Sequence, residues 1–140
     1  MLCAISASII TEREYFMKTF ELKKYGRTLE ITVEAASYPE GNLAVLLNCR
    51  EDGVFVPWNT LTVNLGTVRP LDCAYIDINN NGAEILEWIQ ENGLAEPTGR
   101  IGRSGYCTYP EYHFHPELLK ELDPEGYAAY LAEWEGRYGA

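Results

Sequence analysis

The chain has 140 residues, 46% of them hydrophobic and 23% charged, which fits one soluble globular domain. No apolar run approaches the roughly 20 residues of a membrane-spanning helix, so a transmembrane protein is excluded. The 21 acidic and 11 basic residues give a net charge of −10, which argues against direct nucleic-acid binding, because phosphate contacts need clustered Lys and Arg. The same charge suits either simple solubility or competition with nucleic acid for a basic protein.

The first sixteen residues differ in character from the rest. Residues 2–10 are mostly apolar but lack the basic start and the small-residue cleavage site of a signal peptide. Arg13-Glu14 can be encoded as a ribosome-binding sequence just before Met17. We therefore expect translation to start at Met17, residues 1–16 to be a non-native or disordered leader, and residues 17–140 to form the single domain.

The four cysteines are widely spaced and form no C-x-x-C pair; they are Cys3, Cys49, Cys73 and Cys107. An even count alone does not make a disulfide framework in a chain of this size. We expect free thiols in a reducing, cytoplasmic compartment, with Cys73 and Cys107 buried in strands.

Residues 20–78 show the period-2 alternation of half-buried strands. Residues 23–27 predict a hairpin turn in which Gly26 is free to take positive φ. Pro57 cannot donate a ladder hydrogen bond and marks an edge strand or a bulge. The strands predicted from the alternation cover residues 20–22, 29–33, 43–47, 54–56, 60–65 and 74–78.

The pattern changes to a helical period over residues 83–92, where Ile85, Trp88 and Ile89 share one face and Gly93 ends the helix. Residues 107–114 alternate again and predict a last strand, interrupted by Pro110.

Two later helices are predicted to start at prolines. His115 and Asp123 each stand directly before a proline and are the expected N-caps. The final helix has an apolar face of Tyr127, Tyr130, Leu131, Trp134 and Tyr138. Strands followed by helices indicate an α+β fold. We expect one domain with an antiparallel sheet of about five or six strands, packed with two or three helices in the C-terminal half.

A metal is the first candidate ligand. His113 and His115, the only histidines, would share one face of a strand with Glu111 and Cys107. The spacing from Cys107 to His113 is not a recognised zinc pattern, and His115 has a competing role as a helix cap. We assign no metal or cofactor. A metal- or anion-binding domain or enzyme centred on residues 100–115 stays open as the alternative function.

An anion is the second candidate ligand, because Arg100 and Arg103 lie among glycines whose backbone N–H groups could converge on it. Alternatively, the glycines form turns and the arginines pair with the chain's own acids. No G-K-[ST] phosphate-binding loop is present.

No residue stands out as catalytic. Neither Ser104 nor Cys107 lies in a nucleophile elbow, and Asp72 and Asp77 would point to opposite faces of a strand. We therefore assign no catalytic residue and expect a non-enzymatic protein.

A protein partner is the remaining possibility. Residues 83–140 carry eleven acidic and four basic residues, and tyrosines are frequent at interfaces. Solvated helix faces and a tyrosine-rich core are the simpler explanations of the same features. The residues predicted to bind a partner are Arg100, Arg103, Tyr106, Tyr109, Tyr112, Glu117, Glu121, Glu125, Glu133 and Glu135.

The middle of the chain contains five recognisable segments, which are Thr60–Leu65, Asn79–Asn81, Glu91–Leu94, Thr98–Arg100 and Ser104–Pro110. They resemble an uncharacterised domain-of-unknown-function family of gut Firmicutes, often encoded on conjugative or other mobile elements. The resemblance implies a bacterial, cytoplasmic accessory protein and assigns no site residues.

Because such elements often carry inhibitors of host restriction or CRISPR systems, we expect a small acidic interaction protein whose partner is a basic, nucleic-acid-binding defence protein. A structural accessory of conjugation or replication machinery is a further alternative.

Overall fold

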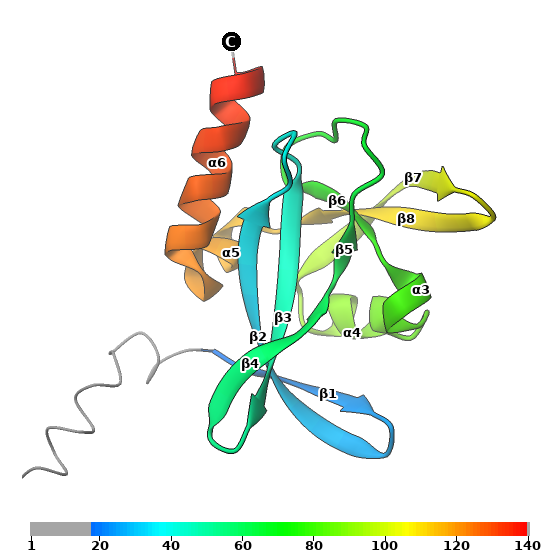
Figure 1. Ribbon diagram of the computed structural model, residues 1–140, viewed down its shortest axis with the longest axis vertical. Helices are drawn as coiled ribbons and strands as arrows, with labels where there is room; N and C mark the ends of the chain where they lie inside the picture. Colours follow the sequence, from blue (N-terminus) through cyan, green and yellow to red (C-terminus); the bar gives the residue numbers. More distant parts are fainter. Residues whose placement is uncertain (1–17, 140) are drawn as a thin grey trace, which may run out of the picture.

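A computed structural model describes residues 18–139 of the chain (Figure 1). The predictions for residues 1–16 and for Cys3 lie outside these described residues. The strands are β1 (Phe20–Lys24), β2 (Arg27–Ser37), β3 (Leu43–Glu51), β4 (Val54–Thr60), β5 (Thr62–Val63), β6 (Cys73–Ile76), β7 (Ala95–Ser104) and β8 (Cys107–Phe114). The helices are α3 (Ile78–Asn81), α4 (Ile85–Glu91), α5 (Pro116–Leu122) and α6 (Pro124–Tyr138).

The first four strands form an antiparallel sheet in the order β1-β2-β3-β4. Alternate residues of β2, such as Ile31, Val33 and Ala35, face the core and pair with buried residues of β3. The predicted turn between β1 and β2 is confirmed, with Gly26 at a φ of 71°.

Pro57 also has its predicted role. It lies in the edge strand β4, where Asn48 pairs with Pro57 while the preceding Leu47 pairs with Asn59. Trp58 is therefore the extra residue of a bulge, which accommodates the missing proline donor.

The second sheet has the order β5-β6-β8-β7, also antiparallel. The predicted strand at residues 60–65 is divided at the buried Leu61. Its N–H donates to the Val45 carbonyl and its C=O accepts from the Asp77 N–H, so the backbone of Leu61 connects the two sheets. The prediction of a single sheet with five or six strands is therefore corrected to two four-stranded sheets.

Strand β7 is the element that the sequence prediction missed, because Pro97, Gly99 and Gly102 are typical of a loop. The pairing of β7 with β8 is irregular between Pro97 and Ile101, and this irregularity accommodates Pro97 and Gly99. Gly102 is needed for close approach, since a Cβ there would lie 2.6 Å from Leu65 and 2.7 Å from Tyr75.

The helices confirm the α+β class. The predicted helix at residues 83–92 is α4, and Gly93 follows it at a φ of 67°. Pro116 and Pro124 begin α5 and α6 as predicted. The additional element, α3, is a single turn. None of the helices within residues 18–139 is long and apolar enough to cross a membrane.

The two predicted caps differ. The Asp123 side chain accepts from the Gly126 N–H at 3.1 Å, which confirms it as an N-cap. His115 stands at the N-cap position of α5 but makes no side-chain capping bond, so that part of the prediction is wrong.

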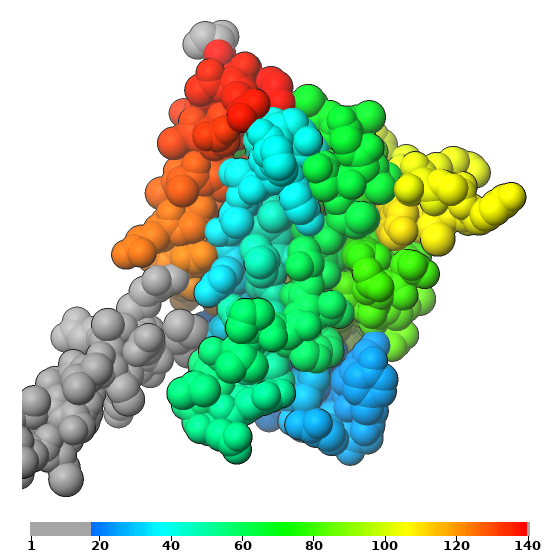
Figure 2. Space-filling model, in the orientation of Figure 1, coloured from blue at the N-terminus to red at the C-terminus, as the bar shows by residue number. Residues whose placement is uncertain are grey.

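One core joins both sheets and the helices, with Ile31, Leu61, Ile76 and Phe114 each fully buried. Helices α5 and α6 pack against β2, and α4 packs near β7. Figures 1 and 2 show α6 at one margin of the molecule and the β7–β8 hairpin projecting from the opposite margin.

Candidate interaction surface

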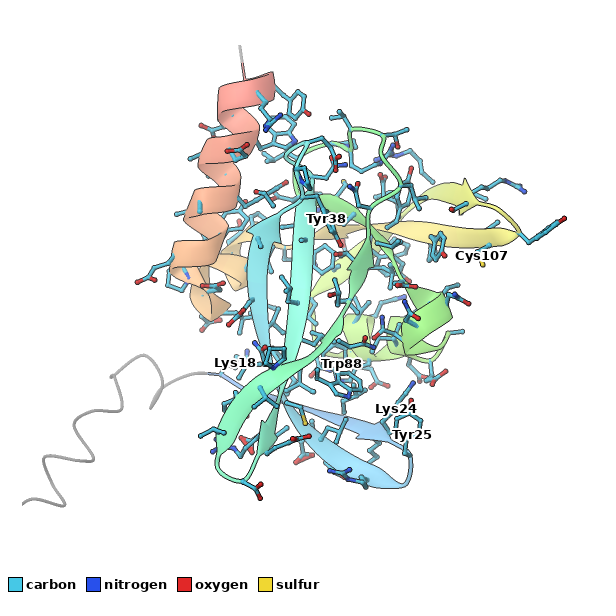
Figure 3. The ribbon with its side chains drawn as sticks, viewed as in Figure 1. Lys18, Lys24, Tyr25, Tyr38, Trp88 and Cys107 are labelled. Atoms are coloured by element: carbon cyan, nitrogen blue, oxygen red, sulfur yellow. The ribbon has the colours of Figure 1, made fainter. Side chains whose placement is uncertain are left out.

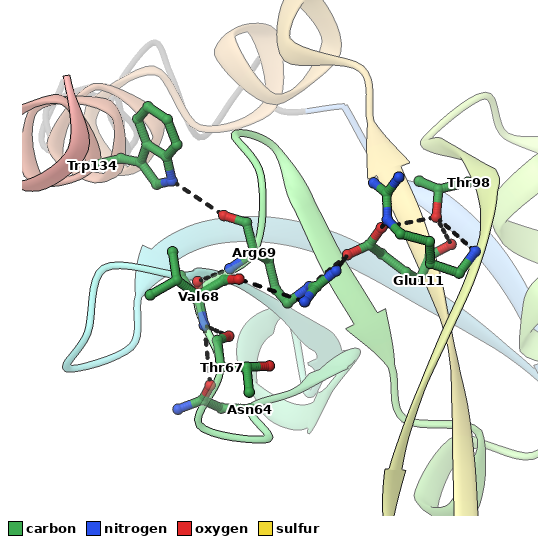
Figure 4. Close-up of polar contacts among 9 residues, drawn as sticks. Asn64, Thr67, Val68, Arg69, Thr98, Glu111 and Trp134 are labelled. Carbon is green, nitrogen blue, oxygen red and sulfur yellow. Dashed lines mark hydrogen bonds and ion pairs between the residues drawn. The ribbon is translucent and has the colours of Figure 1, made fainter. Parts of the chain in front are cut away.

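The β7–β8 hairpin is fixed at its base by a buried carboxylate. The Glu111 side chain, on β8, is 0% exposed. Its Oε2 accepts from Arg69 Nε at 2.6 Å, and its Oε1 accepts from Arg100 Nε at 2.6 Å and from Thr98 Oγ1 at 2.8 Å (Figure 4). Both carboxylate oxygens are thus paired.

Burial raises the pKa of Glu111, but the hydrogen bonds from Thr98 and Arg69 and the arginine charges outweigh it, so the pKa lies below the ordinary value. Glu111 is therefore ionised at neutral pH. Arg100 pairs with Glu111 of its own chain. For this residue, the prediction that the arginines pair with internal acids is therefore confirmed, rather than the prediction of an external anion.

Arg69 extends the cluster toward α6. Its N–H donates to Asn42 Oδ1 at 2.8 Å, and its C=O accepts from Trp134 Nε1 at 3.4 Å. Its guanidinium lies 4.7 Å from the centre of the Tyr75 ring. No spacing pattern in the sequence points to this cluster, since 42 residues separate Arg69 from Glu111.

The outer half of the hairpin is exposed. Gly105 has a φ of 60° in the turn that joins Ser104 to Cys107, and the next residue, Tyr106, is fully exposed. The Ile101 side chain is also exposed, and Arg103 makes no ion pair with another described residue.

Two of the predicted partner-binding tyrosines belong to the interior. Tyr109 and Tyr112 are 7% and 4% exposed, and the Tyr112 hydroxyl accepts from Gln90 of α4. Side chains on both faces of β8 are covered, so the tyrosine-rich core accounts for these residues, as it does for Tyr127 and Tyr130.

The predicted acidic residues are all exposed on α5 or α6; they are Glu117, Glu121, Glu125, Glu133 and Glu135. Glu133 accepts from Arg137 at 2.8 Å. These helices lie across the molecule from the hairpin tip (Figure 1). The structure therefore separates the predicted residues into two surfaces.

The candidate metal ligands do not assemble. Within residues 18–139, His, Cys, Asp and Glu side chains form no group of three that could hold an ion. His113 is exposed and His115 half-buried, while Glu111 is occupied by the arginines.

Two of the acidic residues considered as catalytic groups make contacts within the fold. Asp72 accepts from the Tyr127 hydroxyl at 2.7 Å, and Asp77 caps α3. Burial raises the pKa of Asp72, and burial with the nearby Glu111 charge raises the pKa of Cys73 to about 11. The prediction of buried cysteines is confirmed for Cys73, whereas Cys107 is half-buried.

A depression of about 300 Å³ lies at the β4 bulge, lined by residues that include Trp58, Asn48 and Asn59. Glu34 is the one ionisable residue among those that line it. The residues that line the depression therefore do not include a pair of groups for acid–base catalysis.

Comparison with curated proteins and with solved structures finds no significant match. A family model, described as a domain of unknown function (DUF4313), matches residues 29–134. The match covers all strands from β3 to β8 and includes the Glu111 cluster and the hairpin. The chain therefore belongs to the DUF4313 family.

Proposed function

We propose that this chain is a non-enzymatic interaction protein that binds a basic, nucleic-acid-binding protein through the acidic surface of α5 and α6. The observation that carries the proposal is the exposure of the glutamates on these two helices. The helices bury Leu119, Leu122, Tyr127 and Tyr130 against the sheet and present carboxylates to solvent.

The acidic surface has the charge and the spacing for electrostatic competition. Residues 115–139 contain six acidic and two basic residues. Glu117 and Glu121 lie four residues apart on α5, which places them on one face with a rise of about 6 Å. An array of this kind attracts a basic groove and excludes nucleic acid from it.

We extend the proposal to inhibition of a host defence protein, such as a restriction or CRISPR component, in the bacterial cytoplasm. This extension is supported by the acidic charge and by the resemblance of the central segments to proteins of mobile elements. Glu133 contributes less than its neighbours, because Arg137 already pairs with it.

Affinity capture from a host lysate tests the proposal. The tagged full chain is compared with a triple variant, Glu117→Lys, Glu121→Lys and Glu135→Lys, at low and high salt. The matched control reverses three exposed glutamates elsewhere, Glu87→Lys, Glu91→Lys and Glu96→Lys, with the same change in net charge.

We expect a basic nucleic-acid-binding protein to be retained by the wild type and the control, released by high salt, and lost by the triple variant. Equal loss in both variants would indicate nonspecific attraction. Full retention by the triple variant would eliminate the acidic surface as the binding site.

A further inference from the structure

Two tyrosines at the tips of hairpins are not explained by the fold. Tyr25, between β1 and β2, is 83% exposed, and Tyr106, between β7 and β8, is fully exposed. Both hairpins project on the side of the molecule away from α6, and Figure 3 labels Tyr25 at one tip and Cys107 beside the other.

The turn geometry does not require either ring. Tyr25 and Gly26 have φ values of 53° and 71°, the signs of a type I′ turn, whose first position favours Asn, Asp or Gly. The β3–β4 turn has the same signs with the favoured Asp52 and Gly53. In the Gly105–Tyr106 turn only the first residue has positive φ, so any residue suits the second position.

Three cations in these two hairpins have no partner among the described residues, whereas Lys24, in the first tip, pairs with Glu84 and lies 5.6 Å from the centre of the Tyr25 ring. Among residues 18–139, Lys23, Arg27 and Arg103 are the cations with neither an ion pair nor an aromatic ring, and all three lie in the two hairpins. The other two cations without ion pairs, Lys18 and Lys120, lie over the rings of Phe20 and Tyr127 (5.6 and 5.9 Å). Unpaired cations are unexpected in a chain with such an excess of acid.

The complementary surface is on the far side of the same molecule. Glu117, Glu121 and Glu135 make no ion pair with another described residue. Helix α6 also exposes the small side chains of Ala128, Ala129 and Ala132, on which a tyrosine ring can lie.

We propose that the two hairpin tips, Lys23–Arg27 and Arg103–Tyr106, bind the acidic α5–α6 surface of a second copy of this chain. Tyrosine and arginine supply the contact and carboxylates supply the opposite charge. Because the two surfaces differ and face apart, the contact is heterologous and the assembly grows head to tail. A basic partner of the proposed kind would compete for the same acidic surface, but the inference does not depend on that partner.

Sedimentation of the purified full chain tests the inference. We expect the average mass to rise with concentration at low salt, without stopping at a dimer. It should return to the monomer in 1 M NaCl, where the Debye length is about 3 Å. Tyr106→Asn and Arg103→Glu should each weaken association at least about tenfold.

A charge swap makes the test specific. Arg103→Glu and Glu121→Lys should each associate at least about tenfold more weakly than the wild type when alone, because like charges then meet at the contact. An equimolar mixture should associate again, since each variant's tip meets an opposite charge on the other's helices. Tyr25→Asn should weaken association while raising the urea midpoint, because Asn suits the turn, so a loss cannot be attributed to unfolding.

A monomer at every concentration, a Tyr106→Asn variant that associates like the wild type, or a mixture that stays monomeric would each overturn the inference. Titration of a labelled single-stranded oligonucleotide at low salt tests whether the tips bind nucleic acid instead. If the wild type binds the oligonucleotide but does not self-associate, and Tyr106→Asn no longer binds it, the tips would be assigned to nucleic acid and the inference overturned. Lysate capture that survives Tyr106→Asn would leave the proposed function intact.

Discussion

At the scale of single residues, Glu111 carries the largest expected stability effect. Replacing it by glutamine leaves both Arg69 and Arg100 without a charged partner. Breaking a buried ion pair in this way typically destabilises by 3–5 kcal/mol, and because Arg100 is partly solvated we expect about 3 kcal/mol for Glu111→Gln. Urea unfolding measures the loss. The exposed Glu121→Gln should change the free energy of unfolding by less than about 0.5 kcal/mol.

The effect of Glu111→Gln on stability depends on pH. The folded-state pKa of Glu111 is lowered, so its contribution is present above the ordinary glutamate pKa, about 4.3, and is lost as pH falls through the folded value. The stability gap between wild type and Glu111→Gln should therefore shrink below about pH 4. The raised pKa of Asp72 acts in the opposite direction and is common to both proteins, so it cancels in the difference. A gap that stays constant to low pH would contradict the ionised pair.

At the scale of elements, Asp123 joins a helix to a strand edge. Strand β1 pairs with β2 only as far as Ile31, and no other strand of residues 18–139 pairs with this edge of β2 beyond that point. Asp123 Oδ2 accepts from the Ala35 N–H at 3.0 Å, while Oδ1 caps α6 through Gly126. One carboxylate thus starts the helix and docks it against the sheet.

We expect Asp123→Ala to destabilise by about 2–3 kcal/mol, from a lost cap of about 1 kcal/mol and a buried N–H left without an acceptor. Asp123→Asn keeps one oxygen and should lose about half as much. Hydrogen exchange should accelerate first at the Ala35 and Gly126 amides. Exchange that changes equally throughout the chain would argue against a local role.

Elements with local signals were predictable, and those fixed by distant contacts were not. The final helix followed from its Asp-Pro start and its apolar period. Strand β7 was hidden because Pro97, Gly99 and Gly102 look like a loop until β8, Leu65 and Tyr75 surround them.

The residues of the candidate site also fall into those that the local sequence predicts and those that depend on distant contacts. The exposure of the glutamates on α5 and α6 follows from the helical period alone. The burial of both Tyr109 and Tyr112 does not, because the two residues lie on opposite faces of β8 and alternation predicts only one buried face. The pairing of Arg100 with Glu111 was foreseen only as one of two alternatives.

At the scale of the whole molecule, net charge and local contacts act on stability in different ways. The triple reversal of Glu117, Glu121 and Glu135 changes the net charge from −10 to −4, since each substitution adds two charges. Lysine is unfavourable at position 117, in the first turn of α5, but favourable at position 121, in its last turn, and at position 135, near the end of α6, so the helix-dipole effects largely oppose one another. The remaining effect is reduced self-repulsion, which stabilises the compact state.

We therefore expect the triple variant to unfold at the same or a higher urea concentration than the wild type at 0.01 M salt, where the Debye length is about 30 Å. The difference should disappear as added salt shortens that length, while the wild-type midpoint itself rises. The buried Glu111 pair is screened much less, so the deficit of Glu111→Gln should persist at high salt. A triple variant that is less stable at every salt concentration would mean that these carboxylates make specific contacts within the fold, and loss of partner binding could then no longer be attributed to the surface alone.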